Sequence, residues 1–352
     1  GTGATGIRTI QTIAPKVGSL TVFQRTPNWS APLHNRPIDK AEMAEIRTKY
    51  PEIFQRCQET FSCFLHTADP RKTFEVSEAD REAFWEHLYA SPGFEIWVGN
   101  FSDVLTDRVA NKAMSDFVAR KIRQRVNDPA VAEKLIPKNH GFGTRRVPME
   151  THYFEVYNQP NVRLIDVKEN PIQRITETGI VTADETFEFD MIIYATGFDA
   201  ITGAFDRIDI RGANGRLLKD EWKGGPRTFL GLQVRGFPNM AMLMGPHTAL
   251  GNLPRSIEYS VEWVTRLLKH MSDNRLTFMD ATQQGVDDWT AHVHACGEGL
   301  LSNEVDSWMT GINSNIDGKN TRIIARYSGS APAYREKADA VADGGFKELV
   351  VG

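Results

Sequence analysis

Hydrophobic positions in the first part of the chain follow two spacings, one typical of helices and one typical of strands. A glycine-rich stretch at residues 1–6 precedes residues 7–14, whose apolar positions fall on one face of a helix. Residues 20–23 then form a short β-branched and aromatic run, which is typical of a strand. The order predicts a loop, a helix and a strand.

The pattern changes at about residue 37 and changes back near residue 140. Between these points the sequence is rich in charge and has helical periodicity. It predicts amphipathic helices at residues 40–50, 80–89 and 111–125. We therefore expect a helical insertion in this part of the chain.

Strand-like sequence returns after the insertion. A strand is predicted at residues 162–165, a hairpin around residues 177–179, and a buried strand at residues 189–194. Further elements are predicted as turns at residues 212–225, a strand at 241–244 and a long helix from about 256 to 270. Strands alternating with helices indicate an α/β protein.

Composition narrows the class of partner. With 352 residues and 41% hydrophobic content, the chain is long enough for about two domains. Its 41 Lys and Arg residues against 45 Asp and Glu residues give a formal charge of −4, which disfavours nucleic acid and acidic membranes as partners. Cys57, Cys63 and Cys296 form no disulfide pattern, and no signal peptide or membrane-length apolar run is seen, so we expect a soluble, cytoplasmic protein that binds a small molecule.

The first residues form the pattern G-x-G-x-x-G, with glycines at Gly1, Gly3 and Gly6 and with Thr2, Ala4 and Thr5 between them. In a dinucleotide site the first glycine permits a tight turn, the second lets the pyrophosphate approach the backbone, and the third lets helix and strand pack closely. The pyrophosphate then lies at the helix N-terminus. A helix and a strand follow in the required order, although the strand that should precede Gly1 is not in the chain.

The end of the predicted strand at residues 20–23 selects the coenzyme. NAD enzymes carry an Asp or Glu about 20 residues after the glycines, whereas an Arg there accommodates a 2′-phosphate. Here Arg25 and Thr26 occupy that place, which favours NADPH over NADH. The alternative is that residues 1–6 are a linker and Arg25 is a solvated surface charge.

Several further stretches share their order and spacing with one enzyme family. Together they resemble the Baeyer–Villiger monooxygenases, the FAD- and NADPH-dependent enzymes that insert oxygen beside a ketone carbonyl. The matching stretches are residues 1–6, 21–29, 143–148, 195–199, 225–231, 244–247 and 307–311, and the region of Tyr334 and Arg335. The resemblance extends over essentially the whole chain.

The resemblance implies a Rossmann-like NADPH-binding domain with a helical insertion, joined to part of an FAD-binding domain. It assigns residues 1–36 and 141–197 to the NADPH domain, 37–140 to the insertion and 198–352 to the FAD domain. It also implies that a ketone and O₂ react through a C4a-peroxyflavin to give an ester or a lactone. Because the family's own FAD glycine loop and its F-x-G-x-x-x-H-x-x-x-W-[P/D] signature are absent, we expect a C-terminal portion that binds FAD poorly alone.

The resemblance also assigns site residues. Arg146 matches the arginine that faces the peroxide, and Trp308 matches a tryptophan near substrate and nicotinamide. Arg145 matches the residue that joins Arg25 and Thr26 around the 2′-phosphate. The remaining cofactor positions are Ala195, Thr196 and Gly197 at a crossing between domains, and Gly245 and Pro246 before a helix, near the flavin ring.

Other interpretations stay open at this point. Arg145 and Arg146 can be an exposed basic pair, and a lone Trp308 is more often a core residue. The chain can belong to a flavin-containing or N-hydroxylating monooxygenase acting on N or S, or be a truncated, non-catalytic NADP(H)-binding protein. No metal is expected, since His292 and His294 do not share a helix face and lack a second ligand pair.

Overall fold

The computed structural model describes residues 1–313 and 315–352, and it divides into two compact units. The first unit comprises Gly1–Pro37 and Ala68–Gly197, and the second comprises Ile38–Thr67 and Phe198–Gly352. The charged helical stretch between residues 37 and 140 is therefore shared by both units. The assignment of cofactors to segments of the chain stays a prediction.

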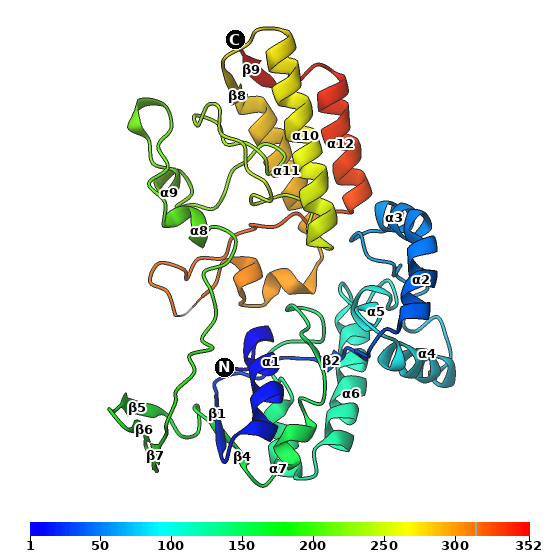
Figure 1. Ribbon diagram of the computed structural model, residues 1–352, viewed down its shortest axis with the longest axis vertical. Coiled ribbons are helices and arrows are strands. Elements are labelled where there is room, and N and C mark those ends of the chain that lie inside the picture. Colours follow the sequence, from blue (N-terminus) through cyan, green and yellow to red (C-terminus); the bar gives the residue numbers. More distant parts are fainter. Residues whose placement is uncertain (314) are drawn as a thin grey trace. The chain divides into compact units, whose positions relative to one another are not determined.

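The first unit contains two parallel two-stranded sheets, β1–β4 and β2–β3, a three-stranded antiparallel sheet, β5–β6–β7, and several helices (Figure 1). Its elements are α1 (Ala4–Ile13), η1 (Ala14–Lys16), β1 (Leu20–Gln24), β2 (Ala31–Pro32), α4 (Glu78–Ala90), α5 (Glu95–Val98), α6 (Arg108–Arg125), α7 (Pro129–Leu135), β3 (Met149–Glu150), η2 (Glu155–Asn158), β4 (Val162–Asp166), β5 (Ile172–Ile175), β6 (Gly179–Thr182) and β7 (Thr186–Glu188).

The predicted loop, helix and strand at the start of the chain are confirmed as α1 and β1. The helix buries Gly6, Ile7 and Ile10, which lie on one face because they are spaced by three and four residues. Strand β1 pairs in parallel with β4, with Leu20 opposite Val162. The predicted hairpin is confirmed as the antiparallel pair β5 and β6.

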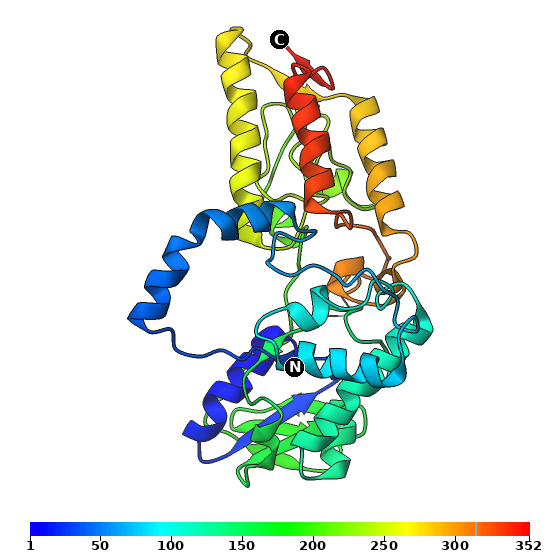
Figure 2. The same ribbon diagram turned by 90° about the vertical axis from the view of Figure 1, so that its right-hand side faces the viewer.

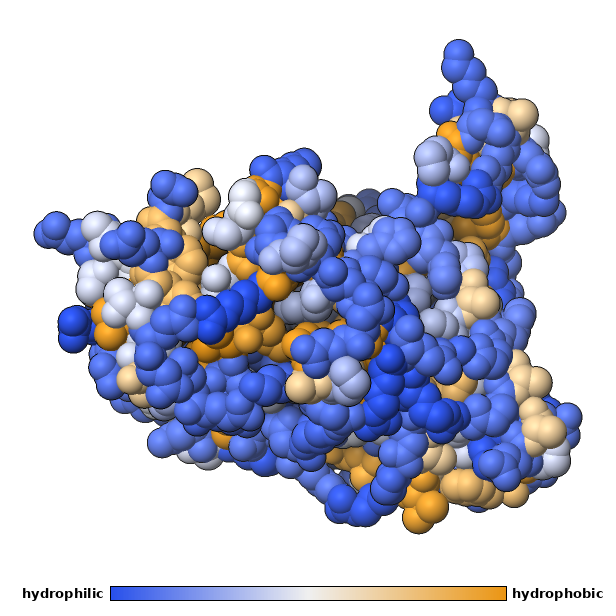
Figure 3. Space-filling model, turned by 90° about the horizontal axis from the view of Figure 1, so that it is seen from below, coloured by the Kyte–Doolittle hydropathy of each residue, from blue (hydrophilic) through white to orange (hydrophobic). Residues whose placement is uncertain are grey.

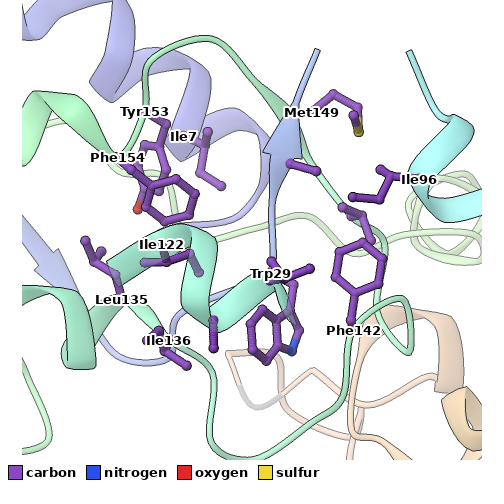
Figure 4. Packing of buried hydrophobic residues seen from close by; sticks show 14 of the residues in the cluster. Ile7, Trp29, Ile96, Ile122, Leu135, Ile136, Phe142, Met149, Tyr153 and Phe154 are labelled. Atoms are coloured by element: carbon purple, nitrogen blue, oxygen red, sulfur yellow. The ribbon is translucent and has the colours of Figure 1, made fainter. Parts of the chain in front are cut away.

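Apolar side chains from distant segments form the core of the first unit. Figure 4 shows Ile7 from α1, Ile122 from α6 and Trp29 packed among other buried residues. Trp29 meets Phe142 edge-on, with ring centroids 6.5 Å apart. This packing fixes the segment after β1 against the segment that contains residues 140–148.

The second unit is dominated by three helices, α10, α11 and α12, which Figure 2 shows together with the short strands near the C-terminus. Trp263 of α10 donates its indole N–H to the Ala338 carbonyl of α12 at 2.7 Å. The elements of this unit are α2 (Lys40–Thr48), α3 (Tyr50–Glu59), α8 (Gly203–Asp206), η3 (Ala213–Gly215), α9 (Leu218–Glu221), α10 (Leu253–Asp273), β8 (Met279–Ala281), α11 (Gln283–Gly297), η4 (Leu301–Glu304), η5 (Trp308–Thr310), α12 (Ala331–Asp343) and β9 (Leu349–Val351).

The predicted buried strand at residues 189–194 is wrong. These residues form no strand, and Met191 and Ile193 are 75% and 50% exposed. Phe189 instead extends the hairpin by donating its N–H to the Thr178 carbonyl. A strand needs a neighbouring strand for its backbone hydrogen bonds, and none of the described strands pairs with this segment.

The strand predicted at residues 241–244 is also wrong. Met242 donates its N–H to the Leu232 carbonyl, but no ladder continues from this bond. Met244 has a φ of +65°, a left-handed conformation that ends an extended run. The apolar pattern here reflects burial of Met242 in a small cluster with Leu218 and Trp222 rather than a strand.

In the view of Figure 3, hydrophobic residues lie in several patches between hydrophilic ones. Within the described residues, no helix combines the length and apolar character needed to cross a bilayer. Cys57, Cys63 and Cys296 are free thiols.

Candidate functional site: the glycine loop and its arginines

The three glycines of the loop have different surroundings. A side chain at Gly6 would overlap the Gly1 carbonyl oxygen, whereas an added Cβ at Gly3 would meet nothing within 4 Å. Gly3 is the N-cap of α1, and its carbonyl accepts the N–H of Ile7 at 2.9 Å. Gly6 therefore serves close packing inside the unit, while the space beside Gly3 at the start of α1 is open.

Ala195 lies against the loop. A side chain at Gly1 would overlap the Ala195 carbonyl oxygen, and one at Gly6 would come 3.7 Å from the Ala195 Cβ. Gly197 has a φ of +103°, which favours glycine because side chains rarely adopt that conformation. The structure thus brings the residues 195–197 segment next to the glycine loop, although the two are far apart in sequence.

The residues that follow β1 are bonded to the loop. The Thr2 hydroxyl donates to the Thr26 carbonyl at 3.1 Å. The side chain of Arg25, in the same segment as Thr26, is exposed.

Asn28 connects this segment to the two arginines at residues 145 and 146. Its amide nitrogen donates to the Arg146 carbonyl at 3.2 Å, and its amide oxygen is 3.3 Å from His140 Nε2. Trp29 donates to the His140 carbonyl at 2.8 Å. Sequence reasoning missed Asn28, although it lies inside the motif at residues 21–29.

The loop that carries the two arginines packs against helix α6. The Phe142 N–H donates to the Ser115 hydroxyl of α6 at 2.9 Å, and a side chain at Gly141 would overlap Asn111 of the same helix. Gly143 has a φ of +77°, and a Cβ there would press on Leu105 and Trp97. Glycine is therefore required at both positions for the loop to pack.

Arg145 and Arg146 differ in their surroundings. Arg145 is half-buried, and its positive charge adds to burial in lowering the pKa of His140 to about 3. His140 is therefore neutral at physiological pH. Arg146 is exposed, with its guanidinium carbon 6.0 Å from the centre of the Phe94 ring. Arg145 is therefore partly enclosed by the protein, whereas Arg146 is accessible to an incoming molecule.

Gly245 and Pro246 lie in a tight turn of the second unit. A side chain at Gly245 would overlap the Gly231 carbonyl oxygen, and the Gly245 carbonyl accepts the Thr248 hydroxyl at 2.7 Å. Six residues separate Pro246 from the start of α10 at Leu253. The first turn of that helix therefore does not include Gly245 or Pro246.

His247 fixes this turn to its neighbours. Its Nε2 lies 2.9 Å from the Ile324 carbonyl, and its Nδ1 lies 3.2 Å from the Thr228 hydroxyl. Burial lowers the pKa of His247 to about 4, so the ring is neutral. Because a carbonyl only accepts, Nε2 carries the proton and Nδ1 accepts from Thr228.

Trp308 begins the short helix η5 and is 39% exposed, so it is not a core residue. Ser307 caps this helix, and Thr310 returns a hydrogen bond to the Ser307 backbone. Trp308 borders a small cavity with Thr202 and Lys319, and the Lys319 ammonium donates to the Thr202 hydroxyl at 2.9 Å. Trp308, Gly245 and Pro246 belong to the second unit, whereas Arg146 belongs to the first.

The cluster of His292 and Cys296 has no third metal-binding partner among the described residues. The Cys296 sulfur lies 3.6 Å from His292 Nε2 on the same face of α11.

Comparison with known proteins shows which proteins resemble this chain in sequence and in fold. No family model matches the chain. It is 47% identical to a 2-oxo-Δ³-4,5,5-trimethylcyclopentenylacetyl-CoA monooxygenase of Pseudomonas putida over 97% of the chain and 63% of that protein. It is 39% identical to an acetone monooxygenase (methyl acetate-forming) of Gordonia sp. strain TY-5, over 99% of the chain and 65% of that protein. The crystal structure of OTEMO with FAD and NADP matches with a TM-score of 0.95 and 45% identity, over all of this chain and 65% of that one.

The chain belongs to the Baeyer–Villiger monooxygenase family. Its α/β fold is that of the family's flavoproteins. The chain spans just under two thirds of the length of the relatives that it matches. The related OTEMO structure contains both FAD and NADP.

Proposed function

We propose that this chain carries the NADPH site and the catalytic arginine of a Baeyer–Villiger monooxygenase, which converts a ketone to an ester or a lactone. One observation supports the proposal above the others. The segment from Arg25 to Asn28 is hydrogen-bonded to the glycine loop through Thr26 and to Arg146 through Asn28. One short segment would thereby position both the coenzyme-binding loop and the catalytic arginine.

The first unit fits a phosphorylated dinucleotide. Open space beside Gly3 leaves room for a pyrophosphate at the N-terminus of α1, where backbone N–H groups and the helix dipole favour negative charge. Arg25, Thr26 and Arg145 would hold the 2′-phosphate, because guanidinium groups form paired, charge-assisted hydrogen bonds with phosphate oxygens. NADPH is the coenzyme that uses such a set.

Arg146 is suited to the oxygenation step. Its guanidinium is exposed, so it can donate to a negatively charged oxygen that forms during the reaction. FAD, when bound, supplies the redox and oxygen chemistry with electrons from NADPH. Ala195, Thr196 and Gly197 are proposed cofactor-binding residues of the first unit. In the second unit, Gly245 and Pro246 would contact the flavin, and Trp308 would contact the substrate.

Ketones are the proposed substrate class. Both curated relatives are named for carbonyl compounds, one a 2-oxo-cyclopentenylacetyl-CoA and one acetone. O₂ is the proposed second substrate. Oxygenation of a soft nitrogen or sulfur atom is the alternative outcome that the assay below distinguishes.

The test is an activity assay on the chain with NADPH, a panel of ketones, amines and sulfides, and FAD in large excess, because this portion is expected to bind FAD weakly. We expect ketone-dependent NADPH oxidation with formation of an ester or lactone. Arg146→Gln should leave NADPH binding within about twofold and reduce product formation by at least about a hundredfold, which corresponds to about 3 kcal/mol of lost transition-state stabilisation. Arg174→Gln, on the exposed strand β5, is the matched control.

Three results would refute parts of the proposal. Product formation from amines or sulfides alone would replace the Baeyer–Villiger assignment. Tight NADPH binding without turnover of any substrate would favour a non-catalytic NADP(H)-binding chain. Full oxygenation by Arg146→Gln would remove Arg146 from catalysis.

A further inference from the structure

The second unit contains a cavity of about 430 Å³ whose charged lining residues are all basic. Its polar side chains are Arg227, His294, Arg322, Thr290, Asn303 and Thr310. No carboxylate is among the residues that line it. None of these residues belongs to the proposed NADPH site, which lies in the first unit.

The two arginines are oriented by carboxylates that lie outside the lining. Arg227 forms an ion pair with Asp287 through one nitrogen. Arg322 donates to Asp306 at 2.5 Å and to the Asn303 carbonyl at 2.6 Å. A guanidinium has five N–H donors, so each arginine keeps donors that these described bonds do not use. The carboxylates hold the side chains in place without filling the cavity.

A third arginine, Arg326, lies close in the sequence to residues that line the cavity. Arg326 donates to the Ser302 hydroxyl at 2.5 Å and has no carboxylate partner among the described residues. Ser302 directly precedes Asn303, and Arg326 lies two residues after Ile324, and both Asn303 and Ile324 line the cavity. Burial lowers the pKa of Arg326 to about 10, which still leaves it charged at neutral pH. A buried charge of this kind is stabilised by a nearby anion.

Size and apolar contacts narrow the class of ligand. A volume of about 430 Å³ lies in the range of small-molecule sites and exceeds the size of a single phosphate ion. Pro226, Ile323 and Ile324 give one side of the cavity an apolar surface. We infer that this cavity binds a phosphorylated small organic molecule, with the arginines and hydroxyls holding the phosphate and the apolar residues contacting the organic part.

The cavity adjoins segments assigned to flavin and substrate. The Ile324 carbonyl accepts from His247, which fixes the turn at Gly245, and Thr310 belongs to the same short helix as Trp308. A phosphorylated ligand here would either be a second molecule or carry the phosphate on a substrate whose reactive end lies near Trp308. In either case, whether the ligand is a separate molecule or the substrate itself, a phosphate group would contact the same arginines.

The test is calorimetric titration of the full chain with glucose 6-phosphate, with glucose as the matched neutral compound, and with pyrophosphate. We expect glucose 6-phosphate to bind at least about tenfold more tightly than glucose, and to bind more weakly as salt is raised. Binding of pyrophosphate at equal strength would mean that the phosphate alone determines recognition, as for a separate phosphorylated ligand. Equal binding of glucose and glucose 6-phosphate, or no binding of either phosphate compound at millimolar concentration, overturns the inference.

Variants locate the binding. Arg227→Gln and Arg322→Gln should each weaken glucose 6-phosphate binding, and together they should weaken it by about tenfold or more, with NADPH affinity unchanged. Arg211→Gln removes a carboxylate-paired arginine of the same unit that does not line the cavity, and should have no effect. The single variants remove half-exposed ion pairs and should fold even if the double variant does not. Unchanged phosphate binding in folded Arg227→Gln and Arg322→Gln would contradict the inference, independently of whether NADPH binds.

Discussion

The glycine loop of the first unit and the turn around Gly245 in the second unit carry similar sequence signals, but their surroundings differ. Gly3 has open space where a side chain would be, whereas the same space at Gly245 is filled by the Gly231 carbonyl. The space beside Gly3 can admit a ligand, whereas glycine is required at position 245 by packing within its own unit.

The two regions also differ in charge. The first region contains the basic residues Arg25 and Arg145, and the charge of Arg145 acts on His140, which contacts Asn28. The turn in the second unit instead contains His247, which burial keeps neutral and whose two nitrogens are both used for internal bonds. The first region is suited to binding an anion, and the second is suited to holding a fixed backbone.

Substitution of Gly245 should have the largest effect on stability. We expect Gly245→Ala to lower the free energy of unfolding by about 3 kcal/mol, because the new methyl group must displace the Gly231 backbone. Denaturant unfolding measures the change. A variant as stable as the wild type would show that the turn relaxes easily and would weaken the contrast between the two regions.

The buried histidine gives the second unit a pH dependence. Between about pH 6.5 and pH 4 the unfolded chain binds a proton at His247 that the folded chain does not, so stability falls as pH falls through this window. The loss should be on the order of 3 kcal/mol by pH 4, with no contribution from this group above pH 6.5.

Thermal unfolding of wild type and His247→Gln across this pH range checks the assignment. His140, whose pKa is also lowered by burial, contributes in the same direction from the first unit, so the variant should remove part of the slope. An identical pH dependence in both proteins would contradict the assignment to His247.

Gly3→Ala should have a smaller effect, and on binding rather than stability. A methyl group at Gly3 meets nothing in the protein, and the φ of −78° suits alanine, so stability should change by less than about 1 kcal/mol. If the pyrophosphate lies against this position, NADPH affinity should fall by about tenfold. Fluorescence titration with NADPH measures it, and unchanged affinity would mean that the open space is not where the coenzyme lies.

Local sequence predicted the elements that depend mainly on their own residues. Helix α1 and strand β1 followed from the apolar spacing, and the hairpin at β5 and β6 followed from the turn residues. The strand predicted at residues 189–194 failed because its formation depends on a neighbouring strand, which periodicity does not report.

The candidate site shows the same division. The glycine loop was recognised from its G-x-G-x-x-G motif, and Arg25 from its position at the end of the predicted strand. The family resemblance added Arg145 and Arg146. Asn28 and the cavity arginines Arg227 and Arg322 were not found, because their roles arise from tertiary contacts between distant segments. Their roles in the candidate sites needed the folded structure.

The central claim is that Arg25 and Arg145 hold one phosphate group of NADPH, and a double-mutant cycle on coenzyme binding tests it most directly. Dissociation constants for NADPH and NADH are measured for the wild type, Arg25→Gln, Arg145→Gln and the double variant. The account predicts that each single variant weakens NADPH at least about tenfold more than NADH, and that the two losses are coupled by about 1 kcal/mol or more. Equal losses for NADPH and NADH would contradict it.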